Sequence, residues 1–254
     1  MRINPHETVQ VTAQPLEQLT GAVLRPVRGH HAFEACVEQL ATAIRLGVYP
    51  TGSTLPAERD LAARLGVSRA TLREAMAALR QAGLVETTRG RGGGTVVTRR
   101  GRGRFARRAA RVTAAQRHDW LDALDFRRIV EPGAAALAAE AELDPDQRAS
   151  LQAAHDAVAA ANRPGDHRQA DSRFHLTVAA VSGSTRTVEA VTSVQASLHE
   201  MLLSIPFLGA NISHSHRQHR DLTTAILKGR ADRARRVMEE HCDDTAALLR
   251  AFLG

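Results

Sequence analysis

One stretch, residues 55–97, decides the fold of the N-terminal half of the chain, and it reads LPAERDLAARLGVSRATLREAMAALRQAGLVETTRGRGGGTVV. Pro56 begins a short amphipathic helix, and Gly66 permits a tight turn after it. Ser68 then offers a side-chain oxygen to the exposed N–H groups at the start of a second helix. The apolar residues of this second helix recur at the spacing of one buried face: Leu72, Ala75, Met76 and Leu79.

A β-hairpin is predicted directly after this second helix, which Gly83 ends. Residues 84–88 and 95–98 are predicted as two short strands, and the tip between them, residues 89–94, contains only arginine and glycine. Two helices, a tight turn and a basic hairpin predict a winged helix-turn-helix, whose second helix enters the DNA major groove with its N-terminus first. Spacing alone also allows a small helical hairpin whose arginines are only solvated.

The residues before this stretch predict one supporting helix and a loose N-terminal arm. Residues 32–46 place five apolar side chains on one helical face: Phe33, Val37, Leu40, Ala41 and Ile44. Residues 1–23 lack such periodicity and contain two prolines, so we expect a flexible arm there. Residues 24–27 are expected to form a short extended lead-in.

The segment LPAERDLAARLGVSRATLREAMAALRQAGLV, with the turn formed by Gly47, Pro50 and Gly52, resembles the N-terminal domain of the GntR family of bacterial transcription regulators. The resemblance covers residues 24–98. It implies contacts to DNA from the start of the second helix, its surroundings and the wing: Arg59, Ser68, Arg69, Thr71, Arg73, Arg89 and Gly90. Arg89 and the three glycines after Arg91 depart from the usual wing of that family.

Composition and charge favour two domains with different partners. The first 118 residues contain 19 arginines and 8 acidic residues, whereas the remainder contains 15 basic and 19 acidic residues. A basic front and a mildly acidic back are typical of a protein in which one domain binds nucleic acid. No apolar run approaches the roughly 20 residues of a membrane helix, and no signal peptide is expected. Cys36 and Cys242 read as ordinary helix residues, which favours a cytoplasmic protein.

A basic linker is predicted between the domains. Residues 99–118 contain eight arginines and no acidic residue, and glycines at 101 and 103 favour flexibility. The segment is either a solvated linker or a linker that also contacts DNA phosphates.

The back half, residues 119–254, predicts helices throughout, so the fold class is mainly α: a winged helix-turn-helix followed by an antiparallel helical bundle. Asp144 and Pro145 are an N-cap and first-turn pair, and Pro132 is expected to kink the helix that contains it. The predicted helices cover residues 120–141, 144–161, 165–181, 185–205, 213–228 and 231–252.

Four residues in the bundle form a candidate metal site. Asp171 and His175 are separated by four residues and share a helical face, and His219 and His241 lie on the last two helices. Three neutral imidazoles and one carboxylate suit a divalent ion such as Zn, Ni or Mn. The spacing also allows a histidine-rich surface turn around His214 and His219, or ordinary core histidines.

The same back half resembles the FCD effector domain, which defines the FadR subfamily of GntR regulators. The resemblance rests on Asp171-Ser-Arg-Phe-His175, His219-Arg-Asp-Leu-Thr-Thr-Ala-Ile and Met-Glu-Glu-His241 and covers residues 120–252. It implies a metal held by Asp171, His175, His219 and His241. The Arg-x-x-x-Glu pattern at Arg127 implies that this arginine binds an effector carboxylate; the alternative is that Arg127 only pairs with an acid on a neighbouring helix. Ser184 stands where family members often have asparagine.

These patterns together predict a ligand-responsive transcription repressor that is not an enzyme. We expect a homodimer on a pseudo-palindromic double-stranded DNA operator, released by a small organic acid, with no membrane partner. A metal-dependent, hydrolase-like enzyme fused to a DNA-binding domain is the main alternative, since a His/Asp site can activate water. A purely architectural DNA-binding dimer is the second alternative.

Overall fold

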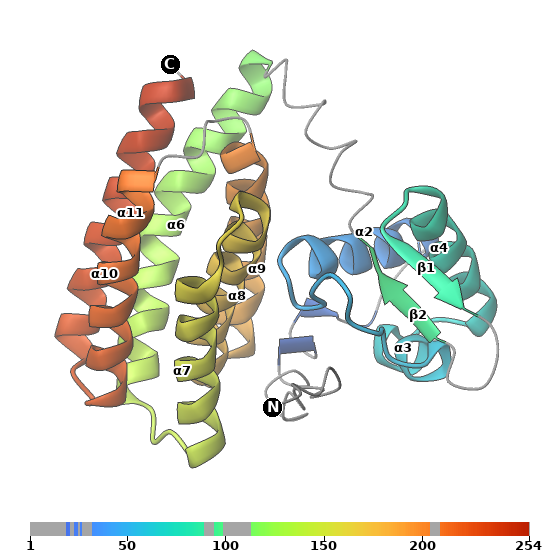
Figure 1. Cartoon of the computed structure of the whole chain (residues 1–254), viewed down its shortest axis with the longest axis horizontal. Coiled ribbons are helices and arrows are strands. Elements are labelled where there is room, and N and C mark those ends of the chain that lie inside the picture. Colours follow the sequence, from blue (N-terminus) through green and yellow to red (C-terminus); the bar gives the residue numbers. More distant parts are fainter. Residues whose placement is uncertain are drawn as a thin grey trace, which may run out of the picture.

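The computed structural model describes residues 19–20, 23–24, 26, 32–88, 94–98, 113–203 and 209–253. Within these residues, the chain forms a tall helical bundle and a smaller unit of shorter helices and a two-stranded sheet (Figure 1). The predicted fold class, mainly α with an N-terminal winged helix-turn-helix and a helical bundle, is confirmed.

The smaller unit begins with residues that the sequence assigned to a loose arm. Leu19 and Val23 are helical and buried, and the N–H of Leu24 donates to the carbonyl of Thr20 at 2.9 Å. The prediction of a loose arm is therefore wrong at these positions, and Leu24 is not extended. Their apolar side chains belong to the core of the unit, and burial outweighs the weak local pattern.

Helix α2, Ala32–Arg45, supports the helix pair as predicted. Cys36, Leu40, Ala43 and Ile44 are buried along its inner face. Phe33, which the sequence places on the same apolar face, is in contrast 36% exposed. Gly47 ends the segment with a φ of +75°, a conformation that glycine adopts at little cost.

Helices α3, Glu58–Leu65, and α4, Arg69–Gln81, form the predicted helix pair. Helix α3 starts two residues after Pro56, since Ala57 is its N-cap, and Gly66 ends it in the left-handed conformation. Ser68 caps α4 as predicted, because its side chain accepts a hydrogen bond from the N–H of Thr71 at 3.0 Å. The predicted buried face of α4 is also confirmed in full: Leu72, Ala75, Met76 and Leu79.

Strands β1, Val85–Thr88, and β2, Gly94–Val97, pair antiparallel with Val85 opposite Val97. The hairpin is thus confirmed, one residue narrower at each outer end than predicted. Thr54 adds an isolated antiparallel bridge to Val96, which ties the segment before α3 to the hairpin. The hairpin tip, with Arg89 and Gly90, and the linker residues 99–112 lie outside the described residues.

In the described part of the bundle there are six long helices: α6 Ala114–Glu140, α7 Pro145–Ala160, α8 Pro164–Val181, α9 Thr185–Leu203, α10 Gly209–Leu227 and α11 Ala231–Leu253. Helix α7 begins with a complete capping box between Asp144 and Gln147, as its Asp-Pro start indicates. Helix α6 starts before the predicted position, since Thr113 caps it, and it continues through Pro132 without a break. Helices α8 and α10 likewise start earlier than predicted.

Helix α6 lies at the centre of the bundle and packs against α8, α9, α10 and α11 (Figure 1). This arrangement explains why Arg127 and Glu131, in the middle of α6, are buried on several sides. None of the helices in the described parts of the chain has the length and apolar character needed to cross a membrane.

The two units contact each other along α2, α8 and α9 (Figure 1). The side-chain amide of Gln169 on α8 donates to the carbonyl of Ile44 on α2 at 2.8 Å, and Arg45 pairs with Glu200 on α9 at 3.2 Å. Leu176 and Ala179 of α8 belong to the same buried apolar cluster as the core residues of α3 and α4. Helix α8 therefore contacts the smaller unit directly.

Candidate functional site: reading helix and histidine cluster

The N-terminal end of α4 presents polar side chains away from its buried face. Ser68, Arg69 and Arg73 are exposed, and Thr71 is half-buried. Arg59, on α3, is also exposed, and its Nε lies 3.0 Å from the carboxylate of Asp60. Exposed arginines at a helix N-terminus match the geometry by which helix-turn-helix proteins read base edges.

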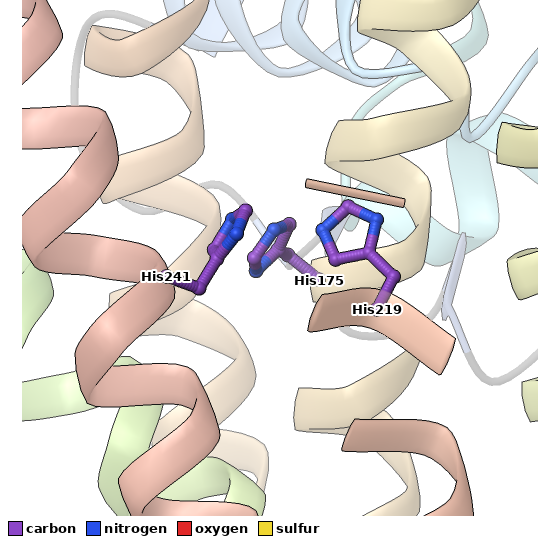
Figure 2. A group of neighbouring side chains, drawn as sticks. All are labelled: His175, His219 and His241. Carbon is purple, nitrogen blue, oxygen red and sulfur yellow. The ribbon is translucent and has the colours of Figure 1, made fainter. Parts of the chain in front are cut away.

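Three histidines from three helices meet inside the bundle. His175 of α8, His219 of α10 and His241 of α11 are buried, and one nitrogen from each lies within 4.8 Å of the others. Figure 2 shows the three rings lying next to one another, each from a different helix. Their ring centroids are separated by 4.7 to 5.3 Å. This part of the structure therefore brings together three of the four residues that the sequence indicates as metal ligands.

Asp171, the fourth predicted ligand, lies at the edge of this cluster. One of its carboxylate oxygens is 3.7 Å from Nε2 of His219, and its side chain is 13% exposed. The i, i+4 spacing on α8 places Asp171 one turn before His175, as the sequence predicts.

A buried ion pair adjoins the histidines. Nε of Arg127 donates to Oε2 of Glu131 at 2.9 Å, and the side-chain amide of Gln195 donates to Oε1 of the same carboxylate at 2.6 Å. Oε2 of Glu131 also lies 3.0 Å from Nδ1 of His175. Arg127 thus points into the bundle, as predicted, and its acidic partner lies on its own helix and not on a neighbouring one.

Two nitrogens of the Arg127 guanidinium are hydrogen-bond donors without an acceptor among the described residues. Within the described residues, Nη1 and Nη2 of Arg127 are buried and have no hydrogen-bond partner. Such buried donors are costly to leave unpaired, by about 1–3 kcal/mol or more for a charged group. They form the two-pronged end of the side chain, which is the geometry that suits a carboxylate.

Burial and neighbouring charges set the protonation of this interior. Burial alone would raise the pKa of Glu131, but the Arg127 guanidinium and His175 overcome it and hold that pKa well below its usual range. Burial, together with neighbouring histidines and Arg127, lowers the pKa of His219 and of His241 well below 6.5. Both rings are therefore neutral at pH 7, as metal ligation requires.

The donor set fits a divalent metal ion. Both ring nitrogens of His175 and both of His219 are buried without a hydrogen-bond partner in the described part of the chain. Buried polar atoms in native structures normally have partners, so unpaired nitrogens around one centre favour a ligand there. Neutral imidazole nitrogens suit Zn and Ni, and an added carboxylate extends the choice to Mn.

The sequence missed several residues that surround the cluster. Glu131 was predictable in part, since its spacing from Arg127 places both on one helical face. The side chain of Gln218 accepts a hydrogen bond from His241 and donates one to Asp244. No motif in the sequence indicates a role for Gln218 or Asp244. The alternative of a histidine-rich surface turn is wrong for His219, which is 1% exposed on α10, although His214 is exposed.

Comparisons with known proteins agree with this architecture. Residues 33–103 match the model of the gntR family of bacterial regulatory proteins, and residues 122–244 match the FCD domain. A putative HTH-type transcriptional regulator, RmpR of Mycobacterium gastri, is 32% identical over 82% of this chain and 76% of its own length. A putative L-lactate dehydrogenase operon regulatory protein of Escherichia coli is 31% identical over 79% of this chain and 80% of its own length. The Glc operon transcriptional activator of E. coli is 28% identical over 82% of this chain and 85% of its own length.

A winged helix-turn-helix joined to a helical effector bundle defines a class of transcription regulators. The chain belongs to the GntR family of bacterial transcription regulators, and its C-terminal part is an FCD domain. The helix-turn-helix implies a DNA partner, and the FCD domain suggests a small-molecule effector.

Proposed function

We propose that this protein is a metal-containing, ligand-responsive repressor that a small carboxylate releases from its operator. The observation that carries the proposal is the buried cluster of His175, His219 and His241 beside the unsatisfied Nη atoms of Arg127. Together these groups offer metal-ligating nitrogens and a two-pronged carboxylate donor in one interior.

The proposed metal ligands are Asp171, His175, His219 and His241, and the ion is Zn, Ni or Mn. A bound ion would supply a positive charge that attracts an anionic effector, and Arg127 would orient the carboxylate through its outer nitrogens. The name of one relative refers to an L-lactate dehydrogenase operon, and lactate is itself a small carboxylate. We therefore propose a small organic acid as the effector.

Helix α8 is the proposed connection between effector and DNA. It carries Asp171 and His175 on the side of the cluster, and it carries Gln169, which donates to Ile44 of the smaller unit. An effector that binds one arrangement of the two units more tightly than another shifts the population toward it. The proposal requires that the effector bind the two arrangements with unequal affinity. Helix α8 contributes to the histidine cluster and also contacts the smaller unit, so it can connect the two.

On DNA, we propose that a homodimer reads a pseudo-palindromic operator through α4. Arg69 and Arg73 would contact bases or phosphates, with Arg59, Ser68 and Thr71 beside them and Arg89 and Gly90 at the wing. The FCD domain supports placement in the FadR subfamily, and a regulator of bacterial genes acts in the cytoplasm. One relative is named an activator, so the direction of regulation needs its own test.

An enzyme would need a base that can take a proton from metal-bound water. Glu131 is the buried carboxylate nearest the cluster, but Arg127, His175 and Gln195 already surround its oxygens. Glu240, next to His241, is exposed. These contacts favour a binding site over a hydrolytic one, as do the relatives, which are transcription regulators.

The test compares His175→Ala with His118→Ala, a change of an exposed histidine on α6. We expect wild type and His118→Ala to carry one divalent ion per chain by elemental analysis and to leave operator DNA when L-lactate or a related acid is added. His175→Ala should lose the ion and the response while keeping effector-free DNA binding. An ion retained by His175→Ala would remove the metal assignment. A normal response without the ion would reduce the metal to structural support.

The regulatory direction is tested separately, by transcription of a reporter behind the operator in cells with and without the protein. Repression predicts higher reporter output when the protein is absent, whereas lower output would show an activator.

A further inference from the structure

A chain of hydrogen bonds runs from the surface of the bundle to His241. Nδ1 of His241 lies 3.1 Å from Oε1 of Gln218, and Nε2 of Gln218 donates to Oδ2 of Asp244 at 2.7 Å. Nε2 of His214 lies 2.9 Å from the same Oδ2 atom, and Arg217 lies 3.1 Å from Nδ1 of His214. His241 and Gln218 are buried, whereas His214 is exposed, so the chain of contacts leads from solvent to the interior.

The direction of each hydrogen bond in this chain follows from chemistry. An ionised carboxylate only accepts, so Asp244 must face the NH2 group of Gln218 and a protonated ring nitrogen of His214. The arginine guanidinium only donates, so Nδ1 of His214 accepts from Arg217 and the ring proton lies on Nε2. Asp244 therefore accepts both of its hydrogen bonds, one from Gln218 and one from His214.

The orientation of Gln218 then fixes the proton of His241. With its NH2 group on Asp244, the amide presents its oxygen to His241, and an amide oxygen cannot donate. Nδ1 of His241 must carry the ring proton, and Nε2 keeps its lone pair. In a neutral imidazole only one nitrogen is protonated, so the other is left able to bind a metal.

We propose that Gln218, anchored by Asp244, is a positioning residue that sets the tautomer of His241 for metal binding. This inference rests on the proposed metal site. Residues that hold a ligating histidine in this way typically change metal affinity 10- to 100-fold when mutated. Oε2 of Glu131 lies 3.0 Å from Nδ1 of His175, although that nitrogen makes no hydrogen bond within the described residues.

The first test replaces the acceptor without changing side-chain length. Gln218→Met should bind Zn²⁺ about 10- to 100-fold more weakly than wild type, measured by competition with a chromophoric chelator. Gln152→Met, the same change on the exposed face of α7, should bind Zn²⁺ as wild type does. Wild-type affinity in Gln218→Met would overturn the positioning role and leave the metal site intact.

The second test reverses the pair instead of removing it. In the double variant Gln218→Glu/Asp244→Asn, the asparagine NH2 group can donate to the new carboxylate, which still accepts from His241. We expect this variant to recover Zn²⁺ affinity to within a few-fold of wild type. A double variant that folds but binds Zn²⁺ as weakly as Gln218→Met would overturn the proposal, because the hydrogen bond would then not be what matters.

The third test reads the tautomer without any metal. Nitrogen-15 NMR of metal-free wild type should place the ring proton of His241 on Nδ1, and Gln218→Met should change that signal. A proton on Nε2 in wild type would overturn the proposal even if Gln218→Met failed to fold. If wild type binds no Zn²⁺, the metal site of the proposed function fails, and the NMR result still decides whether Gln218 sets the tautomer.

Discussion

The two units of this protein differ most in what they bury. In the smaller unit, Thr20 and Tyr49 are the buried side chains with a polar group among the described residues, and mainly leucine, alanine and valine fill the rest of the core. In the bundle, the described interior contains eleven buried polar side chains, among them Arg127, Glu131 and the three clustered histidines. Burying polar groups costs free energy, so their concentration in the bundle indicates that the bundle binds a ligand. The smaller unit has an apolar core and carries its arginines on the surface.

The largest effect is expected from breaking the buried ion pair of the bundle. Glu131→Gln keeps the shape of the side chain but leaves the Arg127 charge uncompensated, which should lower the free energy of unfolding by about 3–5 kcal/mol. Asp243→Asn removes one partner of the Arg128–Asp243 pair, whose side chains are 56% and 50% exposed, and should change stability by less than about 1 kcal/mol. Equal effects in urea titrations would mean that burial of the pair is unimportant.

In the smaller unit, the apolar core should be the sensitive part. Leu72→Ala on α4 removes a fully buried side chain and should lower the free energy of unfolding by about 2–5 kcal/mol. Leu137→Ala on α6, where the leucine is 44% exposed, is the matched control and should change stability by about 0.5 kcal/mol or less. A small effect of Leu72→Ala would show that α4 is not packed as described.

Substitutions on the exposed surface of α4 should change DNA binding and leave stability unchanged. Arg69→Ala should weaken specific DNA binding by about 1–3 kcal/mol without changing thermal stability, because its side chain is exposed at the start of α4. Arg80→Ala, at the other end of α4 where the arginine contacts Thr87, should leave DNA affinity unchanged. Unchanged binding by Arg69→Ala in a gel-shift titration would argue against α4 as the reading helix.

The effect expected to be smallest near neutral pH is a dependence of bundle stability on pH. Since burial lowers the pKa of His219 and His241 in the folded state, the unfolded chain binds protons that the folded chain does not. The stability of metal-free protein should therefore be fully present above about pH 6.5 and decline below it, by up to about 1.4 kcal/mol per pH unit for each histidine. Thermal melts of His219→Gln/His241→Gln should show a flatter decline, and equal slopes would contradict this assignment.

The sequence predicts the parts of the fold that depend on local chemistry. The buried face of α4, the Ser68 cap and the Asp144 N-cap follow from spacing and from side-chain oxygens next to free N–H groups. The exposure of Phe33 and the burial of Leu19 depend on which helices pack together, and local periodicity does not contain that information.

In the histidine cluster, too, local sequence predicts some residues, whereas others depend on how the helices pack. His175 and Arg127 were predictable because their motifs are local. Gln218 and Asp244 were not, since their contacts join residues 23 and 26 positions apart on two helices whose rotation only the packed bundle defines. Asp171 and the DNA-contacting arginines remain predictions.

The close approach at Gly47 limits how this molecule can be recombined. A Cβ atom at position 47 would lie 3.0 Å from the backbone oxygen of Gln169, and the φ of +75° already disfavours any other residue. An engineer who fuses this DNA-reading unit to a different sensor must therefore supply a helix whose backbone fits against Gly47. Simple exchange of the two halves at the linker would join them covalently but would not reproduce the surface through which they touch.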